Sequence, residues 1–387
     1  MNKILPFIVV AQFLCTSLWF AGNAILPDIL QAFDLPGSFL AHITSAVQFG
    51  FISGTLLFAL FTIADRFSPS MVFFASSVLA AVFNLGVLLP GNEGAGILFF
   101  RFATGFFLAG IYPVGMKIAS DYFQKGLGRS LGLLVGALVL GTAFPHLLKN
   151  FTSHLPWKLV IFTTSVLSVL GGFIILLGVP DGPFRKKACL FNWKAFLISF
   201  RDHHFRSAAF GYFGHMWELY TFWTFVPVML FTYQQNFPAV NFNIPLLSFF
   251  IIASGGLACF ISGWFSNEVG VKKLATICLM LSCICCLVSP WFLFVVPAYI
   301  LIIFLVFWGM VVVADSPLFS TLVANNASPE YRGTALTIVN CIGFSITIIS
   351  IQMINLAGPV FGKYIFMFLS IGPLISIAAL LTKHRKV

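Results

Sequence analysis

Residues 105–113 read GFFLAGIYP, and residues 309–317 read GMVVVADSP. Both stretches run from a glycine to a proline with the same spacing, inside long apolar segments. An arginine follows each one, Arg129 sixteen residues after the first proline and Arg332 fifteen residues after the second. A match of this kind between two halves of a chain indicates an internal repeat.

Two further matches occur in the same order in both halves. The loops TIADRFSPS (62–70) and GWFSNEVGVKK (263–273) each place an acidic or amide residue before basic or polar residues at a helix exit. A large apolar residue also stands eight positions before a proline in each half, at Trp19 and Leu219. Together these matches predict two structurally related halves.

The composition identifies the kind of protein in which this repeat lies. Of 387 residues, 59% are hydrophobic and only 8% are charged, and the mean hydropathy is +1.01. A soluble chain of this length needs more charge on its surface. Apolar runs long enough to cross a bilayer recur throughout, so we expect an all-α polytopic membrane protein. The runs between turn signals predict twelve transmembrane helices, at residues 3–26, 39–63, 70–90, 95–118, 129–149, 157–179, 206–232, 244–266, 272–289, 293–316, 332–356 and 359–382.

The distribution of basic residues predicts the orientation. With the N-terminus inside, the inner segments hold 17 of the 21 Lys and Arg residues, and the outer segments hold only Lys149, Lys158 and Lys363. By the positive-inside rule both termini face the cytoplasm, and we expect a bacterial inner membrane. The net charge of +10 therefore sets orientation and meets anionic lipid; it does not indicate nucleic acid.

The longest polar stretch divides the chain almost evenly. It runs PDGPFRKKACLFNWKAFLISFRDHHFR from residue 180, and its aromatic and basic content predicts a segment along the inner membrane surface. We expect an N-terminal six-helix bundle over 1–179, a cytoplasmic linker over 180–205 and a C-terminal six-helix bundle over 206–387.

With these motifs the chain resembles the major facilitator superfamily over its whole length. Asp65 and Arg66 match the Asp-Arg of that family's loop signature after helix two, and RFATG (101–105) matches the Arg and Gly of its fourth helix. The second-half loop, 263–273, preserves more of the signature glycines and lysines. The resemblance implies two bundles rocking about a central cavity lined by helices one, four, seven and ten. It also implies an inner gate, for which the matching residues are Asp65, Arg66, Arg129, Asn267 and Arg332.

An ionisable pair, His215 and Glu218, lies inside the predicted helix seven. An ionised side chain at mid-bilayer costs at least about 2.5 kcal/mol, so each one is a functional candidate. Glu218 lies about 17 Å into the helix, near the midplane, and His215 lies one turn closer to the cytoplasm on the same face. Such a pair can exchange a proton near neutral pH, as proton-coupled transport requires. The alternative is a structural hydrogen bond between the two side chains.

Two more charges lie inside predicted helices, Arg101 in helix four and Asp315 in helix ten. Arginine keeps its proton, so Arg101 can hold an anionic substrate group or bias a carboxylate, but it cannot carry a proton. A buried ion pair or snorkelling is the structural alternative. Asp315 matches Ile111 of the first half, and it precedes Pro317, where we expect a kink with freed carbonyls facing a cavity.

Several neutral residues in the helices can also line a cavity, although aromatic packing or interfacial anchoring explains each equally well. They are Trp19, Asn23, Gln48, Tyr112, Tyr220, Trp223 and Asn340. The cysteines at 278, 283, 285 and 286 have no nearby His or carboxylate in sequence, so we expect no metal site. All cysteines except Cys189 lie inside predicted helices, so we expect no disulfide framework.

These features predict a secondary active transporter for a small organic solute, working by alternating access and coupled to protons. The substrate can be zwitterionic or of mixed charge, or neutral with proton coupling; drug or metabolite efflux in exchange for protons is the nearest alternative. We expect no direct ATP coupling, since the sequence has no nucleotide-binding loop, and no enzyme activity, since it shows no metal or nucleophile constellation. We also expect no cofactor and function as a monomer. A non-transporting receptor or scaffold would explain the helices but not the repeated motifs.

Overall fold

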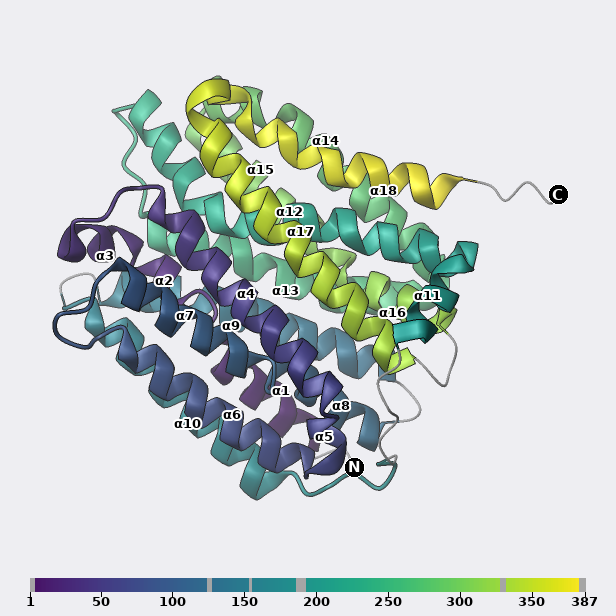
Figure 1. Ribbon diagram of the computed structural model, residues 1–387. Helices are drawn as coiled ribbons and strands as arrows, with labels where there is room; N and C mark the ends of the chain where they lie inside the picture. Colours follow the sequence, from purple (N-terminus) through teal and green to yellow (C-terminus); the bar gives the residue numbers. More distant parts are fainter. Residues whose placement is uncertain (1–3, 124–126, 153–154, 186–192, 328–331, 383–387) are drawn as a thin grey trace. The chain divides into compact units, whose positions relative to one another are not determined.

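The computed structural model describes residues 4–123, 127–152, 155–185, 193–327 and 332–382 (Figure 1). Every regular element in these ranges is helical. The described chain separates into two compact units, one made of residues 1–188 with 243–253 and the other of 189–242 with 254–387. We call them the N-terminal unit and the C-terminal unit.

The N-terminal unit begins with a first segment that is broken twice. Its elements are α1 (Ile4–Thr16), α2 (Ala21–Ala24), α3 (Leu26–Phe33), α4 (Phe39–Leu60), α5 (Ile63–Arg66), α6 (Pro69–Gly86), α7 (Gly94–Leu108), α8 (Tyr112–Tyr122), α9 (Leu127–Phe151) and α10 (Lys158–Gly178). Helix α4 packs against α7, α6 packs against α7 and α10, and α1 packs against α9 and α10.

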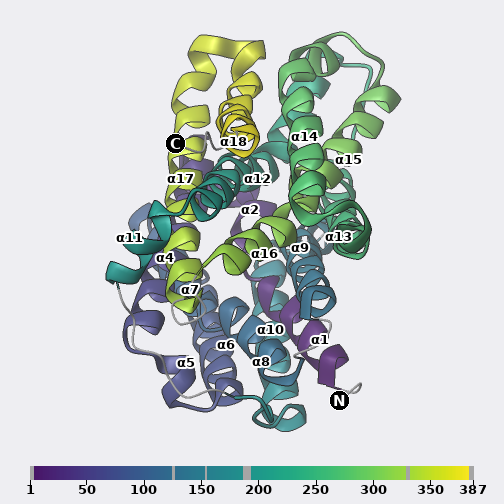
Figure 2. The ribbon, with the colours of Figure 1, turned by 90° about the vertical axis from the view of Figure 1, so that its right-hand side faces the viewer.

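The C-terminal unit is built around one long helix, α12 (His203–Asn236), which packs against the last two helices of the chain. Asp202 caps the start of α12, where its carboxylate accepts a hydrogen bond from the amide of Phe205 at 2.9 Å. The other elements are α11 (Trp193–Arg201), α14 (Val271–Phe294), α15 (Ala298–Ala314), α16 (Ser316–Asn326), α17 (Arg332–Phe361), the 3-10 helix η1 (Gly362–Ser370) and α18 (Ile371–Leu381). Helix α13 (Ile244–Val269) is divided between the units: its residues up to 253 belong to the N-terminal unit and the rest to the C-terminal unit. Figure 2 shows α14 and α15 side by side.

The repeated Gly-to-Pro stretches break their helices at matching places. Helix α7 ends at Leu108 and α8 begins at Tyr112, while α15 ends at Ala314 and α16 begins at Ser316. Pro113 and Pro317 lie in the first turn of the second piece in each case. Proline has no N–H and its ring clashes with the carbonyl four residues earlier, so the break before each proline follows from the sequence.

Close packing explains the glycine at the start of the first stretch. A Cβ on Gly105 would overlap the carbonyl oxygen of Val47 on α4. Only a residue without a side chain lets the backbones of α4 and α7 approach this closely.

Nine helical stretches among the described residues are long and apolar enough to cross a membrane. The twelve predicted spans remain a prediction, and the differences have physical causes. Predicted span 3–26 is divided by the turn at residues 17–20, and predicted spans 332–356 and 359–382 form one helical stretch from 333 to 381. Predicted span 206–232 lies inside α12, which is not among the nine stretches because its polar side chains lower its mean hydropathy.

Candidate functional site

Glu218 lies in the middle of α12 with its side chain buried. Three groups contact one of its oxygens, Oε1. Trp308 Nε1 on α15 donates at 2.7 Å, Cys286 Sγ on α14 donates at 3.2 Å, and the Ser282 hydroxyl, also on α14, donates as well. The indole N–H is only a donor, so Oε1 must act as an acceptor. Three neighbouring side chains therefore solvate a carboxylate that burial would otherwise make costly.

The second carboxylate oxygen of Glu218, Oε2, has no hydrogen-bond partner within the part of the chain that the structure describes. A proton on Oε2 leaves the contacts of Oε1 intact, whereas a proton on Oε1 would weaken them, so protonation at Oε2 is favoured. The two oxygens thus differ in role: one is fixed by the protein and the other is available for a proton.

His215 lies one turn before Glu218 but contacts a different residue. Its Nδ1 is 2.8 Å from Oδ1 of Asp315, and both side chains are buried. The contact between His215 and Glu218 that the sequence suggested is therefore not found among the described residues, where His215 contacts Asp315 instead. Spacing along one helix places side chains on one face, but Glu218 reaches α14 and α15, whereas His215 reaches the break between α15 and α16.

The break at Asp315 occurs where the sequence predicts a kink, but its carbonyls are not left open. Cys259 Sγ on α13 donates to the carbonyl of Val313 at 3.2 Å, and Ser262 Oγ donates to that of Ala314 at 2.5 Å. The expectation that freed carbonyls face a cavity was therefore wrong for these two groups, because small polar side chains of α13 satisfy them.

Arg101 in α7 is fully buried and holds the break in the first segment. Its guanidinium donates to the carbonyls of Leu18 at 3.0 Å and Trp19 at 2.6 Å. It also donates to the side-chain oxygen of Asn84 on α6 at 2.8 Å. Leu18 and Trp19 belong to the turn at residues 17–20, where the helical ladder is interrupted. The arginine takes the place of amide donors that the break removes.

Arg101 has no carboxylate within ion-pair distance among the described residues of the N-terminal unit. The buried ion pair considered from the sequence is thus not present among those residues, and neutral acceptors surround the cation. Asn84 is held in turn by α10, since its amide donates to Ile161, Thr164 and Ser165. The centre of this unit therefore keeps a positive charge that no described anion balances.

The neutral candidates divide into those with partners and those without. Asn23 donates to Thr44 at 2.7 Å, and the ring of Trp19 lies 4.8 Å from that of Phe51. Gln48 on α4 is fully buried, and neither of its side-chain atoms has a partner in the described chain.

In the C-terminal unit the ring of Tyr220 packs between Trp223 and Phe344, each at 5.1 Å. Both candidates thus take part in aromatic packing, and their lining of a cavity stays a prediction. Tyr112 begins α8, and Asn340 lies half-buried on α17.

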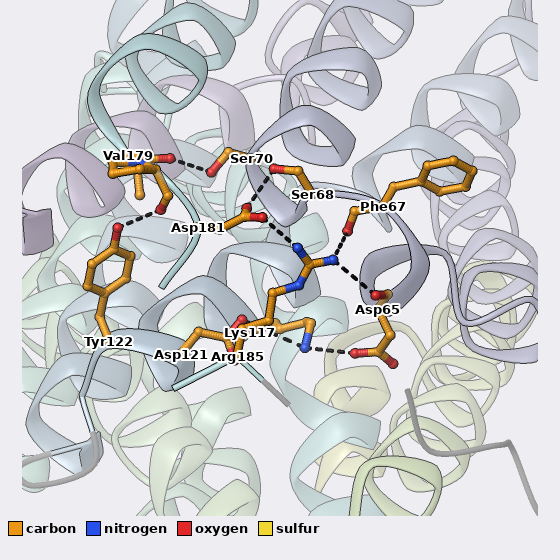
Figure 3. A network of polar contacts seen from close by, with 11 residues as sticks. Asp65, Phe67, Ser68, Ser70, Lys117, Asp121, Tyr122, Val179, Asp181 and Arg185 are labelled. Atoms are coloured by element: carbon orange, nitrogen blue, oxygen red, sulfur yellow. Dashed lines mark hydrogen bonds and ion pairs between the residues drawn. The ribbon is translucent and has the colours of Figure 1, made fainter. Parts of the chain in front are cut away.

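Asp65, one of the predicted gate residues, lies in a polar network at one end of the N-terminal unit (Figure 3). Lys117 Nζ on α8 is 2.7 Å from Asp65 and 3.7 Å from Asp121. Arg185 pairs with Asp181 at 2.5 Å and donates to the carbonyls of Asp65 and Phe67. The loop after α4 is thereby tied both to α8 and to the segment that follows α10.

The gate partners expected for Asp65 are only partly described. Arg66 donates from Nε to the hydroxyl of Thr62 at 3.0 Å. The side chains of Arg129, Asn267 and Arg332 lie outside the described residues. Asp65 therefore has Lys117 as its ion-pair partner within the described chain.

Sequence reasoning missed several groups that the structure places beside the candidates. Trp308, Ser282 and Asn84 contact charged residues, yet none carries a charge that would single it out. His146 was a different omission, since an ionisable residue inside predicted span 129–149 is itself a signal. It is buried on α9, and its Nε2 has no partner among the described residues. No group of three or more His, Cys, Asp and Glu able to hold a metal occurs among the described residues.

Comparisons with known proteins agree with the fold. Residues 8–351 match the family model of the Major Facilitator Superfamily. Among solved structures, the chain is similar to the crystal structure of the human organic anion transporter MFSD10 (TETRAN), at 15% identity and a TM-score of 0.74. The match covers 97% of this chain and 99% of that chain. A comparison with curated proteins found no match.

Proposed function

The chain belongs to the Major Facilitator Superfamily, and from that premise we propose that it is a proton-coupled secondary active transporter. It moves a small organic solute across a membrane by alternating access. The proposal includes the predicted twelve spans, both termini in the cytoplasm of a bacterial cell, and function as a monomer.

The asymmetric environment of Glu218 supports proton coupling most directly. Its Oε1 accepts from Trp308 and Cys286, while Oε2 has no partner among the described residues. A group that carries a proton in one access state and releases it in the other needs one oxygen held in place and one oxygen free to change. Glu218 combines both properties in a buried position.

His215 and Asp315 form the second titratable contact of the same unit, one helical turn away along α12. Thiols of α14 also lie near Glu218, at Cys283, Cys285 and Cys286. A carboxylic acid is ordinarily a much stronger acid than a thiol, so we assign proton transfer to Glu218 and a supporting role to His215 with Asp315.

The network around Asp65 supports a role in access. We propose that the Asp65–Lys117 pair, with Arg66, belongs to a gate at the cytoplasmic side, to which Arg129, Asn267 and Arg332 also contribute. A gate must break and re-form its contacts with each cycle, and partly exposed ion pairs are weak enough to do so.

Proton coupling is tested with purified protein in liposomes that contain a trapped pH dye. Short carboxylates, amino acids, amides and amines are added one at a time, and the internal pH is followed. We expect at least one solute to drive proton movement with the wild-type protein. Glu218→Gln should abolish this movement, because glutamine imitates the protonated acid permanently. Exchange of labelled for unlabelled solute should persist, since exchange needs no release of the proton.

Ser289→Ala is a matched control on α14, because within the described chain the Ser289 hydroxyl donates only to the carbonyl of Cys286 on its own helix. This variant should keep proton movement. Solute-driven proton movement that survives in Glu218→Gln would show that the coupling group lies elsewhere. Solute flux without any proton movement in the wild-type protein would refute proton coupling itself.

A further inference from the structure

The turn at residues 17–20 in the N-terminal unit is flanked by buried polar side chains that the protein leaves without partners. Buried polar groups are nearly always hydrogen-bonded, so an unpartnered one requires an explanation such as an absent ligand or water. Gln48 and His146 are both more than nine-tenths buried, and neither Gln48 side-chain atom nor His146 Nε2 has a partner in the described residues. They come from two different helices, α4 and α9.

Contacts along α4 place Gln48 beside this turn. Asn23 bonds to Thr44, and the ring of Trp19 packs on Phe51. Gln48 lies between Thr44 and Phe51 along α4, so it faces the part of the first segment between Trp19 and Asn23.

Contacts along α9 place His146 at the same level on the opposite flank. A Cβ on Gly141 would overlap the hydroxyl of Thr16, and Lys149 pairs with Asp28 at 2.8 Å. His146 lies between Gly141 and Lys149 along α9, so it is level with the chain between Thr16 and Asp28, and it shares a helix face with Lys149 three residues later. Helix α2, which follows the turn directly, packs against both α4 and α9.

Arg101 supplies the charge at this level. Its N–H groups bond to Leu18, Trp19 and Asn84, all neutral acceptors, and no carboxylate of the described unit lies within ion-pair distance. A unit charge about 8 Å from a ligand, at an effective dielectric constant near 20, changes affinity by about 30-fold. The sign of that effect favours an anion over a neutral molecule and disfavours a cation.

We propose that the turn at residues 17–20 is the recognition site for a small organic anion, with Gln48 and His146 donating hydrogen bonds to its carboxylate. Arg101 attracts the anion by its charge: Nη1 and Nη2 hold Asn84 and the carbonyls of Leu18 and Trp19, and Nε has no partner among the described residues. This inference rests on the proposed function in one respect: it takes the bound anion to be the solute that the protein transports. Since these atoms are buried, the anion reaches them only in a conformation that opens this side of the unit.

Equilibrium binding to the full-length protein in detergent tests the site without any proton gradient. The probes are matched sets with one carbon skeleton each: propionate, propionamide and propylamine; benzoate, benzamide and benzylamine; succinate, succinamide and 1,4-diaminobutane. The shift in unfolding temperature is followed against probe concentration, up to about 20 mM. We expect at least one carboxylate to bind 10-fold or more tightly than its amide, and the amines not to bind.

Gln48→Leu and His146→Leu should each weaken carboxylate binding by about 10-fold or more, the usual cost of a hydrogen bond to a charged group. Gln48→Leu should also raise the unfolding temperature of the ligand-free protein, because it removes an unsatisfied buried amide. His146→Gln should bind better than His146→Leu, since it keeps a donor. Thr104→Val is the matched control, because among the described residues the Thr104 hydroxyl bonds only to the carbonyl of Phe100 on its own helix, at 2.8 Å.

Three results would overturn the proposal. Equal binding of amides or amines would refute the anionic class, and undiminished binding in both leucine variants would refute the location. Absence of stabilisation by any of the carboxylates would refute both. Each result leaves proton-coupled transport standing, because that is judged by solute-driven proton movement and by Glu218→Gln.

Discussion

The two units treat the middle of their first long segment in opposite ways. In the N-terminal unit the segment is broken at residues 17–20, and Arg101 donates to the buried carbonyls of Leu18 and Trp19. In the C-terminal unit α12 runs unbroken through the matching positions. Glu218, which matches Leu18 in the repeat, accepts from neighbouring helices instead. One centre is cationic and donates to backbone; the other is acidic and accepts from side chains.

A shared plan underlies this difference. In both units the donor comes from the helix that carries the repeated glycine, Arg101 on α7 and Trp308 on α15. Trp308 matches Thr104, one turn from Arg101 on the same face. In each unit the helix before that one supplies a second contact to the buried charge: Asn84 on α6 contacts Arg101, and Ser282 on α14 contacts Glu218. The framework is common to both halves, whereas the sign of the charge is particular to each.

The comparison predicts that Arg101 is needed for the fold of its unit. Arg101→Leu should lower the free energy of unfolding by about 3–5 kcal/mol, because three buried acceptors lose their donor. Arg101→Lys should recover little, since one ammonium cannot reproduce the planar fork. Unfolding by denaturant in detergent measures both.

Leu305→Met is the matched control for Arg101, since it changes the corresponding buried position of α15 and should cost less than about 1.5 kcal/mol. If Arg101→Leu were as stable as this control, helix packing and not the guanidinium would hold the break.

Glu218 should behave differently, because its contribution to stability can be separated from its charge. Glu218→Gln should unfold within about 1 kcal/mol of the wild-type protein, since the amide carbonyl still accepts from Trp308 and Ser282. Glu218→Ala should cost about 2–4 kcal/mol, because it leaves those donors unsatisfied and creates a cavity. Equal losses for both variants would make Glu218 a structural residue and remove the contrast between the units.

The sequence predicted the framework well for a physical reason. Proline breaks a helix and glycine permits close approach wherever they stand, so Pro113, Pro317 and Gly105 act locally and can be found by spacing. The family expected from these motifs is confirmed. The charged candidates were also found from sequence, because ionisable residues are rare inside spans.

The partners of those charges could not be found in the same way. His215 and Glu218 share a helix face, but the sequence does not say which neighbouring helix faces each of them. Asp315 and Trp308 lie far from His215 and Glu218 in the sequence, and only the packing of the helices brings them into contact. The turn at residues 17–20 has no proline within it; Thr16 and Ser17 instead bond back to carbonyls of their own helix, and Arg101 completes the break. A break stabilised by a distant side chain leaves little local signal.

The hydrogen bond between Trp308 and Glu218 should appear as an energetic coupling. Trp308→Phe should cost about 1–2 kcal/mol in the wild-type protein and less in a Glu218→Ala background, with a coupling of about 1 kcal/mol. Trp291→Phe, at an exposed position on α14, is the control and should show no coupling. A double-mutant cycle of unfolding free energies measures it. Additive losses would mean that Trp308 acts by packing on Phe222, whose ring lies 4.6 Å away.

The smallest effect is expected where the N-terminal unit carries its partly exposed charges. Lys117→Met should cost about 0.5–1 kcal/mol at low salt, because Lys117 pairs with Asp65 and Asp121 at the edge of the unit. Raising the salt concentration to 1 M, where the screening length is about 3 Å, should remove most of this difference. Lys158→Met, at an exposed position, should show neither effect. A salt-independent loss of several kcal/mol would mean that the Asp65 network, like the contacts of buried Arg101, is a permanent element of the fold. It would then not be a contact that opens and closes.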